Sequence, residues 1–149
     1  MKIQRLVTYT LWANRLVTAM VALLIAILPR LLRWYAGLLG YDLPGGDLLG
    51  IWLSYIGSAP VILVALWNME KLMKSILAGQ VFVRENVRRV RRVQLCCGIV
   101  ALVCLAATVF ALPMVLLAAI MGFLCLTVSV LANVLDAAVA LQEENDLTI

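Results

Sequence analysis

The chain has 149 residues, of which 65% are hydrophobic and 13% are charged, and its mean hydropathy is +1.07. Soluble domains average about half apolar and about a quarter charged residues, so this composition excludes a water-soluble globular protein. The sequence contains no histidine, which removes the commonest general base and the commonest transition-metal ligand. We therefore predict a non-enzymatic membrane protein with no catalytic residues, no cofactor and no metal site.

The first predicted membrane span covers about residues 9–29. The uncharged stretch 16–29 is too short to cross a hydrocarbon core of about 30 Å, so the helix must begin upstream and carry Arg15 in its first turns. The Arg15 side chain can then extend to the membrane surface. Lys2 and Arg5 before an apolar run also fit a signal peptide. We expect the segment to be retained, because Arg15 interrupts the run and no small-residue cleavage site follows it.

An outer loop is predicted at residues 30–47, with a turn at 43–47, where Leu-Pro-Gly-Gly-Asp is typical of a chain reversal. The second span follows at 48–69, a stretch without charge that contains Pro60 as a candidate kink. Aromatic side chains in and near the loop are expected at the level of the lipid headgroups. These are Trp34, Tyr35, Tyr41 and Trp52.

Residues 70–92 form a predicted polar connection between spans two and three. Glu70 and Lys74 are spaced i,i+4, which favours a continuing helix, and Gly79 is a typical helix stop. Beyond it, valines recur at helical spacing with arginines between them. This pattern predicts an amphipathic basic helix that leads into the third span. Its apolar positions are Val83, Val87 and Val90, and its basic positions are Arg84, Arg88, Arg91 and Arg92.

Forty-three consecutive residues, 93–135, carry no charge. As one helix they would extend about 65 Å, roughly twice the thickness of a hydrocarbon core. The stretch must therefore cross the membrane twice. We predict a third span at about 93–112 and a fourth at about 114–135, with the fold-back at Pro113 because proline disfavours helix at and before its own position. A tail at 142–149 ends the chain.

The basic residues divide unequally between the two sides of the membrane. Arg30 and Arg33 lie on one side, and the other ten lysines and arginines lie on the other side. Because basic residues accumulate in the cytoplasm, both termini and the 70–92 connection are predicted to be cytoplasmic. The predicted fold is an all-α, four-helix transmembrane bundle made of two helical hairpins. It forms a single multi-pass domain, 1–149, in the cytoplasmic membrane.

Polar side chains within the spans gather toward the predicted cytoplasmic side. We predict that Arg15 and Asp136 form an ion pair that joins the first and fourth helices, with Asn14, Asn68 and Asn133 nearby. A transport site at this place is the alternative. The cysteines lack the spacing of a metal or redox site, and we interpret all four as small buried hydrophobic residues: Cys96, Cys97, Cys104 and Cys125.

Three interpretations of the basic run at 84–92 stay open. It can be a topology signal that also contacts anionic lipid headgroups, or a docking surface for a cytoplasmic protein. A nucleic-acid site is disfavoured, because the run adjoins a membrane helix and has no interleaved aromatic residues. Small residues along the spans would also permit a homo-oligomer.

Two motifs carry a resemblance to a known family. Gly79 and Phe82 are followed by Glu85-Asn86 and a basic stretch that ends at Val93, and the chain closes on the acidic segment 143–149. The family has Gly-x-x-Phe, then Glu-Asn, then a basic Leu-Arg-x-Ile pattern, of which the last part departs here through valines. With its matching hairpin layout, the chain resembles over essentially its whole length the bacterial family of small four-span membrane proteins catalogued as domain of unknown function 2975.

The resemblance implies little about activity. Members of the family often occur beside small helix-turn-helix regulators, which implies a cytoplasmic surface that binds such a regulator. The expected function is therefore a non-enzymatic membrane regulatory or accessory protein, and the alternative is a small oligomeric transporter or peptide-immunity protein. The candidate partner or lipid surface consists of Phe82, Arg84, Asn86, Arg88, Arg89, Arg91, Arg92, Glu144, Asn145 and Asp146.

Overall fold

A computed structural model describes residues 2–39, 45–109, 112 and 114–147, and within these ranges the chain is α-helical apart from short turns. Each of the four helices is long and apolar enough to cross a membrane. The prediction of an all-α, multi-pass membrane protein with four spans is thereby confirmed. The helices are α1 (Lys2–Leu39), α2 (Gly45–Leu77), α3 (Arg84–Ala107) and α4 (Met114–Leu147).

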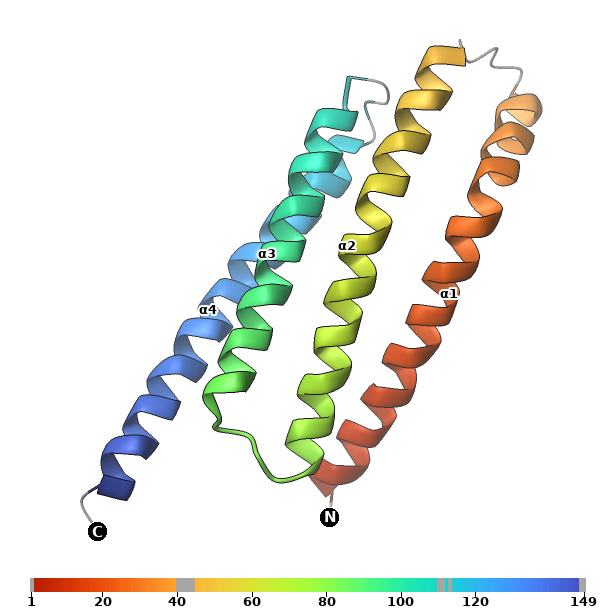
Figure 1. Cartoon of the computed structure of the whole chain (residues 1–149). Coiled ribbons are helices and arrows are strands. Elements are labelled where there is room, and N and C mark those ends of the chain that lie inside the picture. Colours follow the sequence, from red (N-terminus) through yellow and green to blue (C-terminus); the bar gives the residue numbers. More distant parts are fainter. Residues whose placement is uncertain (1, 40–44, 110–111, 113, 148–149) are drawn as a thin grey trace.

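The helices pack in chain order. The backbones of α1 and α2, of α2 and α3, and of α3 and α4 approach closely, and among the described residues no other pair of helices does so. Figure 1 shows α1, α2 and α3 side by side, with the first turn of α1, the last turn of α4 and the α2–α3 connection at the same end. The bundle is therefore a row in which α1 and α4 each have a single neighbour.

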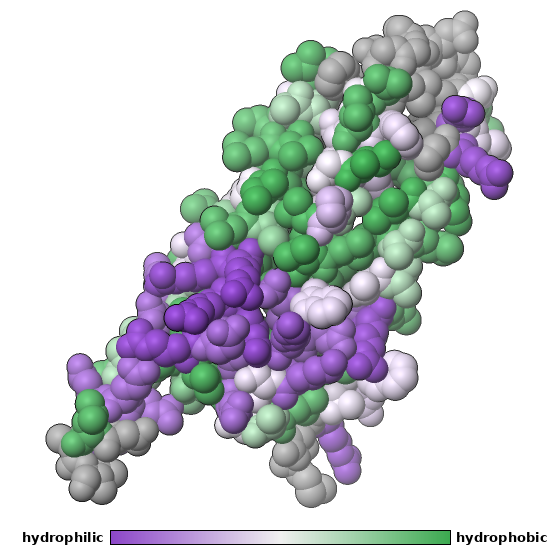
Figure 2. All heavy atoms as spheres, viewed as in Figure 1, coloured by the Kyte–Doolittle hydropathy of each residue, from purple (hydrophilic) through white to green (hydrophobic). Residues whose placement is uncertain are grey.

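Charged side chains gather at the end of the row that contains the α2–α3 connection. Figure 2 shows them as a hydrophilic band, and the surface between this band and the opposite end of the row is mainly hydrophobic. Where α2, α3 and α4 leave this band, their sequences become uncharged, from residue 69 back along α2, from 93 along α3 and from 135 back along α4. We call it the charged band, and its members are Arg15, Glu70, Lys71, Lys74, Arg84, Glu85, Arg88, Arg89, Arg91, Arg92, Asp136 and Glu143.

The lengths of the uncharged helical segments fit a bilayer. At 1.5 Å per residue, residues 114–135 of α4 extend about 33 Å, close to the thickness of a hydrocarbon core of about 30 Å. The α3 segment from 93 to 107 is shorter, about 22 Å. Val109 and Leu112, beyond the end of α3, are highly exposed apolar residues, so the turn between α3 and α4 continues the hydrophobic surface.

Helix α1 is longer than predicted. It extends to Leu39, so residues 30–39 are helical and not part of an outer loop. A proline at position 29 removes only one backbone donor, and leucines and aromatic residues after it can continue the helix. Helix α2 likewise begins at Gly45, within the predicted turn. Tyr41, Leu43 and Pro44 lie outside the described residues.

The other helix ends also differ from the prediction. Helix α3 stops at Ala107, five residues early, because the hydroxyl and backbone N–H of Thr108 both donate to the Leu105 carbonyl at 2.7 and 3.2 Å. The predicted fold-back residue, Pro113, lies outside the described residues. Helix α4 continues to Leu147, so the predicted tail is helical as far as that residue. Glutamine and glutamate are good helix formers, which explains this extension.

Candidate interaction surface at the charged end

The α2–α3 connection is held by its own hydrogen bonds. Gly79 has a φ of +78°, a left-handed conformation that ends α2, and its N–H donates to the Ile76 carbonyl at 3.0 Å. The Gln80 N–H donates to the Ser75 carbonyl, and the Ser75 hydroxyl donates to the Gln80 carbonyl, both at 3.0 Å. The connection is therefore a defined turn, as expected of a glycine helix stop.

Asn86, in the first turn of α3, holds this connection in place through its side chain. Its side chain is fully buried, with 0% exposure, and its amide nitrogen donates to the carbonyls of Gln80 at 2.7 Å and Val81 at 3.0 Å. Its amide oxygen accepts a hydrogen bond from Arg89 at 3.1 Å, and the same Arg89 nitrogen donates to the Lys71 carbonyl at 3.2 Å. Asn86 and Arg89 thus tie the end of α2 to the start of α3.

Gly79 provides a direct test of this turn. We expect Gly79→Ala to lower the free energy of unfolding by about 1 kcal/mol, because a side chain disfavours positive φ even though open space surrounds the site. The matched control is Gly57→Ala, also in open space but within α2, where alanine should leave stability unchanged or slightly higher. Thermal unfolding in detergent measures both variants. Equal losses would contradict the role of Gly79 as a helix stop that requires positive φ.

The C-terminal part of α4 pairs with the start of α3. The Arg84 guanidinium donates to both carboxylate oxygens of Glu143, at 3.0 and 2.6 Å. About two turns farther along α3, Arg91 contacts Asp136 of α4 at 2.8 Å. Arg84 lies 4.0 Å from the same carboxylate. The predicted acidic and basic surfaces therefore neutralise each other in part within one chain.

The predicted Arg15–Asp136 ion pair is wrong. Arg15 instead donates to Glu70 on α2 at 3.1 and 3.3 Å, and Lys74 contacts the same carboxylate at 2.9 Å. The pair cannot form because α1 and α4 lie at opposite ends of the row and do not touch in the described part of the chain. The amide of Asn14 strengthens the α1–α2 contact by donating to the Leu66 carbonyl at 3.2 Å.

A double-mutant cycle distinguishes the two pairings. We expect the effects of Arg15→Gln and Glu70→Gln on thermal stability in detergent to be non-additive, because each removes the same contact. The effects of Arg15→Gln and Asp136→Asn should add, since they remove separate contacts. Additive losses in the first cycle, or coupling in the second, would show that the side chains pair differently in detergent.

The structure divides the predicted partner surface into buried and exposed residues. Asn86 is buried and Arg89 is only 19% exposed, so the prediction that they form a docking surface is wrong. Arg88 is 74% exposed and its nearest carboxylate, Glu85, is 3.9 Å away. Arg92 and Phe82 are also exposed. Glu144 and Asn145 are exposed and engaged in interactions, and the side chain of Asp146 lies outside the described residues.

Sequence reasoning missed an aromatic girdle at the charged end. Tyr9, Trp12 and Trp67 are exposed there, and the Lys71 ammonium lies 5.2 Å from the centre of the Trp67 ring. Such side chains prefer the level of the lipid headgroups. Their positions in the sequence could have indicated this level. Trp12 lies three residues before Arg15, and Trp67 lies three residues before Glu70, the partner of Arg15.

The cysteines take part in helix packing. Cys96 is buried, the other three are partly exposed, and the Cys125 thiol donates to the Gln94 carbonyl at 3.4 Å. The prediction that all four are buried thus holds for Cys96 alone. Within the described ranges, no cluster of three or more cysteine or acidic side chains is arranged to hold a metal ion.

Comparison with known proteins gives one result. No curated protein and no solved structure matches the chain. A family model matches residues 40–149, which include α2, α3, α4 and both predicted motifs. Helix α1 lies outside the match, whereas the resemblance was expected over essentially the whole chain. The chain belongs to the family described as protein of unknown function (DUF2975).

Proposed function

We propose that this protein is a non-enzymatic regulatory or accessory protein of the cytoplasmic membrane whose charged end binds a cytoplasmic protein, such as a small helix-turn-helix regulator. The observation that carries the proposal is that Arg88 and Arg92 are exposed, while their neighbours Arg89 and Arg91 make contacts within the chain. Arg92 has no hydrogen-bond or ion-pair partner among the described residues. These two arginines are therefore available to another molecule.

The position of the surface supports a protein partner. Helix α3 begins at Arg84, eight residues before Arg92, so its start extends about 12 Å from the uncharged segment. Phe82 and Val83 precede that start and are exposed, which places apolar contact area outside the hydrocarbon core. Adjacent apolar and basic side chains suit a partner with an acidic rim around an apolar pocket.

The charge distribution supports a cytoplasmic location for this end. Ten of the twelve basic residues belong to it or to the first turns of α1, and the excess of lysine and arginine faces the cytoplasm in multi-pass proteins. Both termini then lie in the cytoplasm. The same exposed arginines can contact anionic lipid headgroups at the edge of the surface.

The test is a pull-down of the full-length protein in detergent with a purified small helix-turn-helix regulator from the same organism. We expect the double variant Arg88→Gln/Arg92→Gln to lose the regulator. The matched control is Arg30→Gln/Arg33→Gln, which removes the same number of exposed arginines from the far end of α1 and should retain it. Binding that survives in the first variant, with unchanged topology by cysteine labelling, would contradict the proposal.

The alternative function, a small oligomeric transporter or peptide-immunity protein, requires a polar path across the spans. The 320 Å³ cavity described below is lined mainly by apolar side chains, which favours the regulatory function. Uptake of solutes by liposomes that contain the purified protein would reverse this preference.

A further inference from the structure

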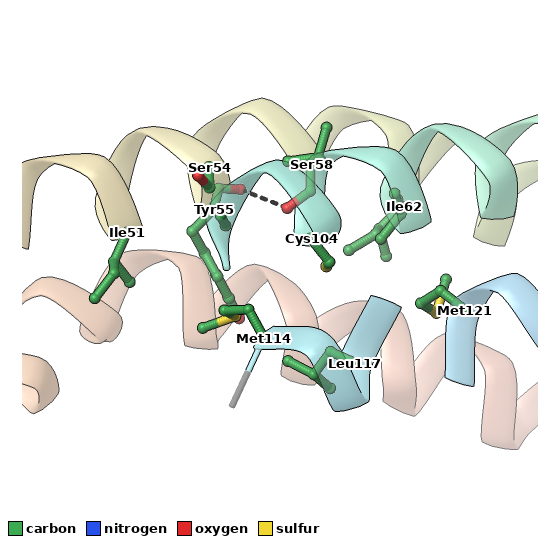
Figure 3. A pocket seen from close by; sticks show the side chains of 12 residues that line it. Ile51, Ser54, Tyr55, Ser58, Ile62, Cys104, Met114, Leu117 and Met121 are labelled. Atoms are coloured by element: carbon green, nitrogen blue, oxygen red, sulfur yellow. Dashed lines mark hydrogen bonds between the residues drawn. The ribbon is translucent and has the colours of Figure 1, made fainter. Parts of the chain in front are cut away.

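A cavity of about 320 Å³ lies between α2, α3 and α4 (Figure 3). Its volume is at the lower end of the range of about 300–1,000 Å³ that is usual for ligand pockets. Among the described residues, helix α1 contributes none to the lining. The lining consists of Ile51, Ser54, Tyr55, Ser58 and Ile62 from α2, Val100, Val103, Cys104 and Ala107 from α3, and Met114, Leu117 and Met121 from α4.

The cavity lies in the half of the membrane away from the charged band. The α3 lining residue nearest the charged band is Val100, which is eight residues from Arg92, or about 12 Å along the helix. The outermost lining residue on α4, Met114, is twenty-two residues from Asp136, or about 33 Å. The cavity therefore extends from mid-membrane to the far edge of a hydrocarbon core of about 30 Å.

The cavity offers little to a polar ligand. The Ser54 hydroxyl donates to the Gly50 carbonyl at 2.9 Å, and the Ser58 hydroxyl donates to the Tyr55 carbonyl at 3.0 Å, so α2 itself satisfies both. The phenol of Tyr55 differs, because it has no hydrogen-bond partner in the described part of the chain. Figure 3 shows its side chain extending from α2 toward Met114, at the outer end of the cavity.

We propose that this cavity holds an acyl chain of a glycerophospholipid from the leaflet opposite the charged band, with the Tyr55 hydroxyl donating to the ester carbonyl. The ester groups of that leaflet lie at the edge of the hydrocarbon core, which is the level of Met114. The chain below the ester then fills the apolar part of the cavity. One donor at the ester level and an apolar space beneath it match the two ends of this ligand.

The surroundings of the cavity favour a lipid over a second copy of the protein. Val109 and Leu112, in the turn beside its outer end, are exposed apolar residues, so lipid surrounds that turn. The space lies between three helices of one chain, and a second copy would have to insert a side chain or a helix end into it. An acyl chain is narrow, flexible and already present at this depth.

The experiment uses the full-length protein in liposomes with a phospholipid that carries a photoreactive group on its acyl chain. We expect labelling at Val100 and Ala107, which line the cavity and are otherwise buried. Cys104→Trp, which fills the cavity, should abolish that labelling. The matched control is Leu102→Trp, a substitution at an exposed position of the same helix, which should preserve it.

A second pair of measurements tests Tyr55. The wild-type protein should be labelled about fivefold more by an ester-linked lipid than by its ether-linked analogue, the effect of one hydrogen bond, and Tyr55→Phe should remove this preference. Labelling confined to exposed residues such as Leu102 and Phe123 would overturn the proposal. So would cross-links between two copies at the cavity residues, or equal labelling by both lipids in the wild type.

Discussion

Replacing Asn86 with alanine is expected to lower the free energy of unfolding by about 3 kcal/mol, because it removes a fully buried amide and leaves the Val81 carbonyl and Arg89 without this hydrogen-bond partner. The Asn86 amide satisfies the carbonyls of Gln80 and Val81 and orients Arg89, and no water reaches a side chain of 0% exposure. Reversible unfolding in mixed micelles measures the loss. The turn should also become susceptible to proteolysis between α2 and α3.

The matched control is Asn68→Ala. Asn68 is almost as buried, but its amide donates to the Val64 carbonyl of its own helix at 2.8 Å. That carbonyl already accepts the backbone bond of α2, so we expect a loss of about 1 kcal/mol or less. Similar losses for both variants would show that burial alone, and not the turn, makes Asn86 necessary.

A second large effect is expected for Ala132→Phe. Ala132 is 1% exposed, and among the described residues α3 is the one helix whose backbone approaches α4 closely, so the Ala132 methyl group lies in the contact between these two helices. Helices in a membrane associate by close packing at small residues. A phenylalanine there must displace α3, with an expected loss of about 3 kcal/mol. Thermal unfolding in detergent measures this loss.

Ala119→Phe is the control for this variant. Ala119 is on the same helix but is exposed, so the larger side chain meets lipid or detergent and should change stability little. If Ala132→Phe proved equally harmless, the α3–α4 contact would be looser than the burial of Ala132 indicates. If both variants were strongly destabilising, phenylalanine itself would be the cause.

The number of spans could be predicted because charge is costly in a bilayer. The uncharged run at 93–135 is too long for one crossing, and this alone requires the α3–α4 hairpin. The order of helices in space could not be predicted in the same way. Glu70 and Asp136 both lie in the charged band, so either could neutralise Arg15, and only the packing of α1 against α2 selects Glu70.

The role of Asn86 was also beyond a pattern of charge and hydropathy. Amid arginines, an asparagine is usually a surface residue, and composition therefore predicted an exposed site. The turn after Gly79 leaves carbonyl groups at Gln80 and Val81 that need donors, and a short amide side chain on the next helix reaches both.

The single neighbour of α1 has a consequence for biosynthesis. Helix α1 leaves the ribosome first, and in the described part of the chain α2 is the one helix that packs against it, so the helix packing of α1 can be complete as soon as α2 has been inserted. Large apolar side chains are exposed along its length even in the finished protein, and they suit a helix that lipid first surrounds completely. Until Glu70 has been synthesised, Arg15 cannot form the ion pair that it makes in the finished protein. The Arg15–Glu70 contact therefore marks the moment at which α1 joins the rest of the chain.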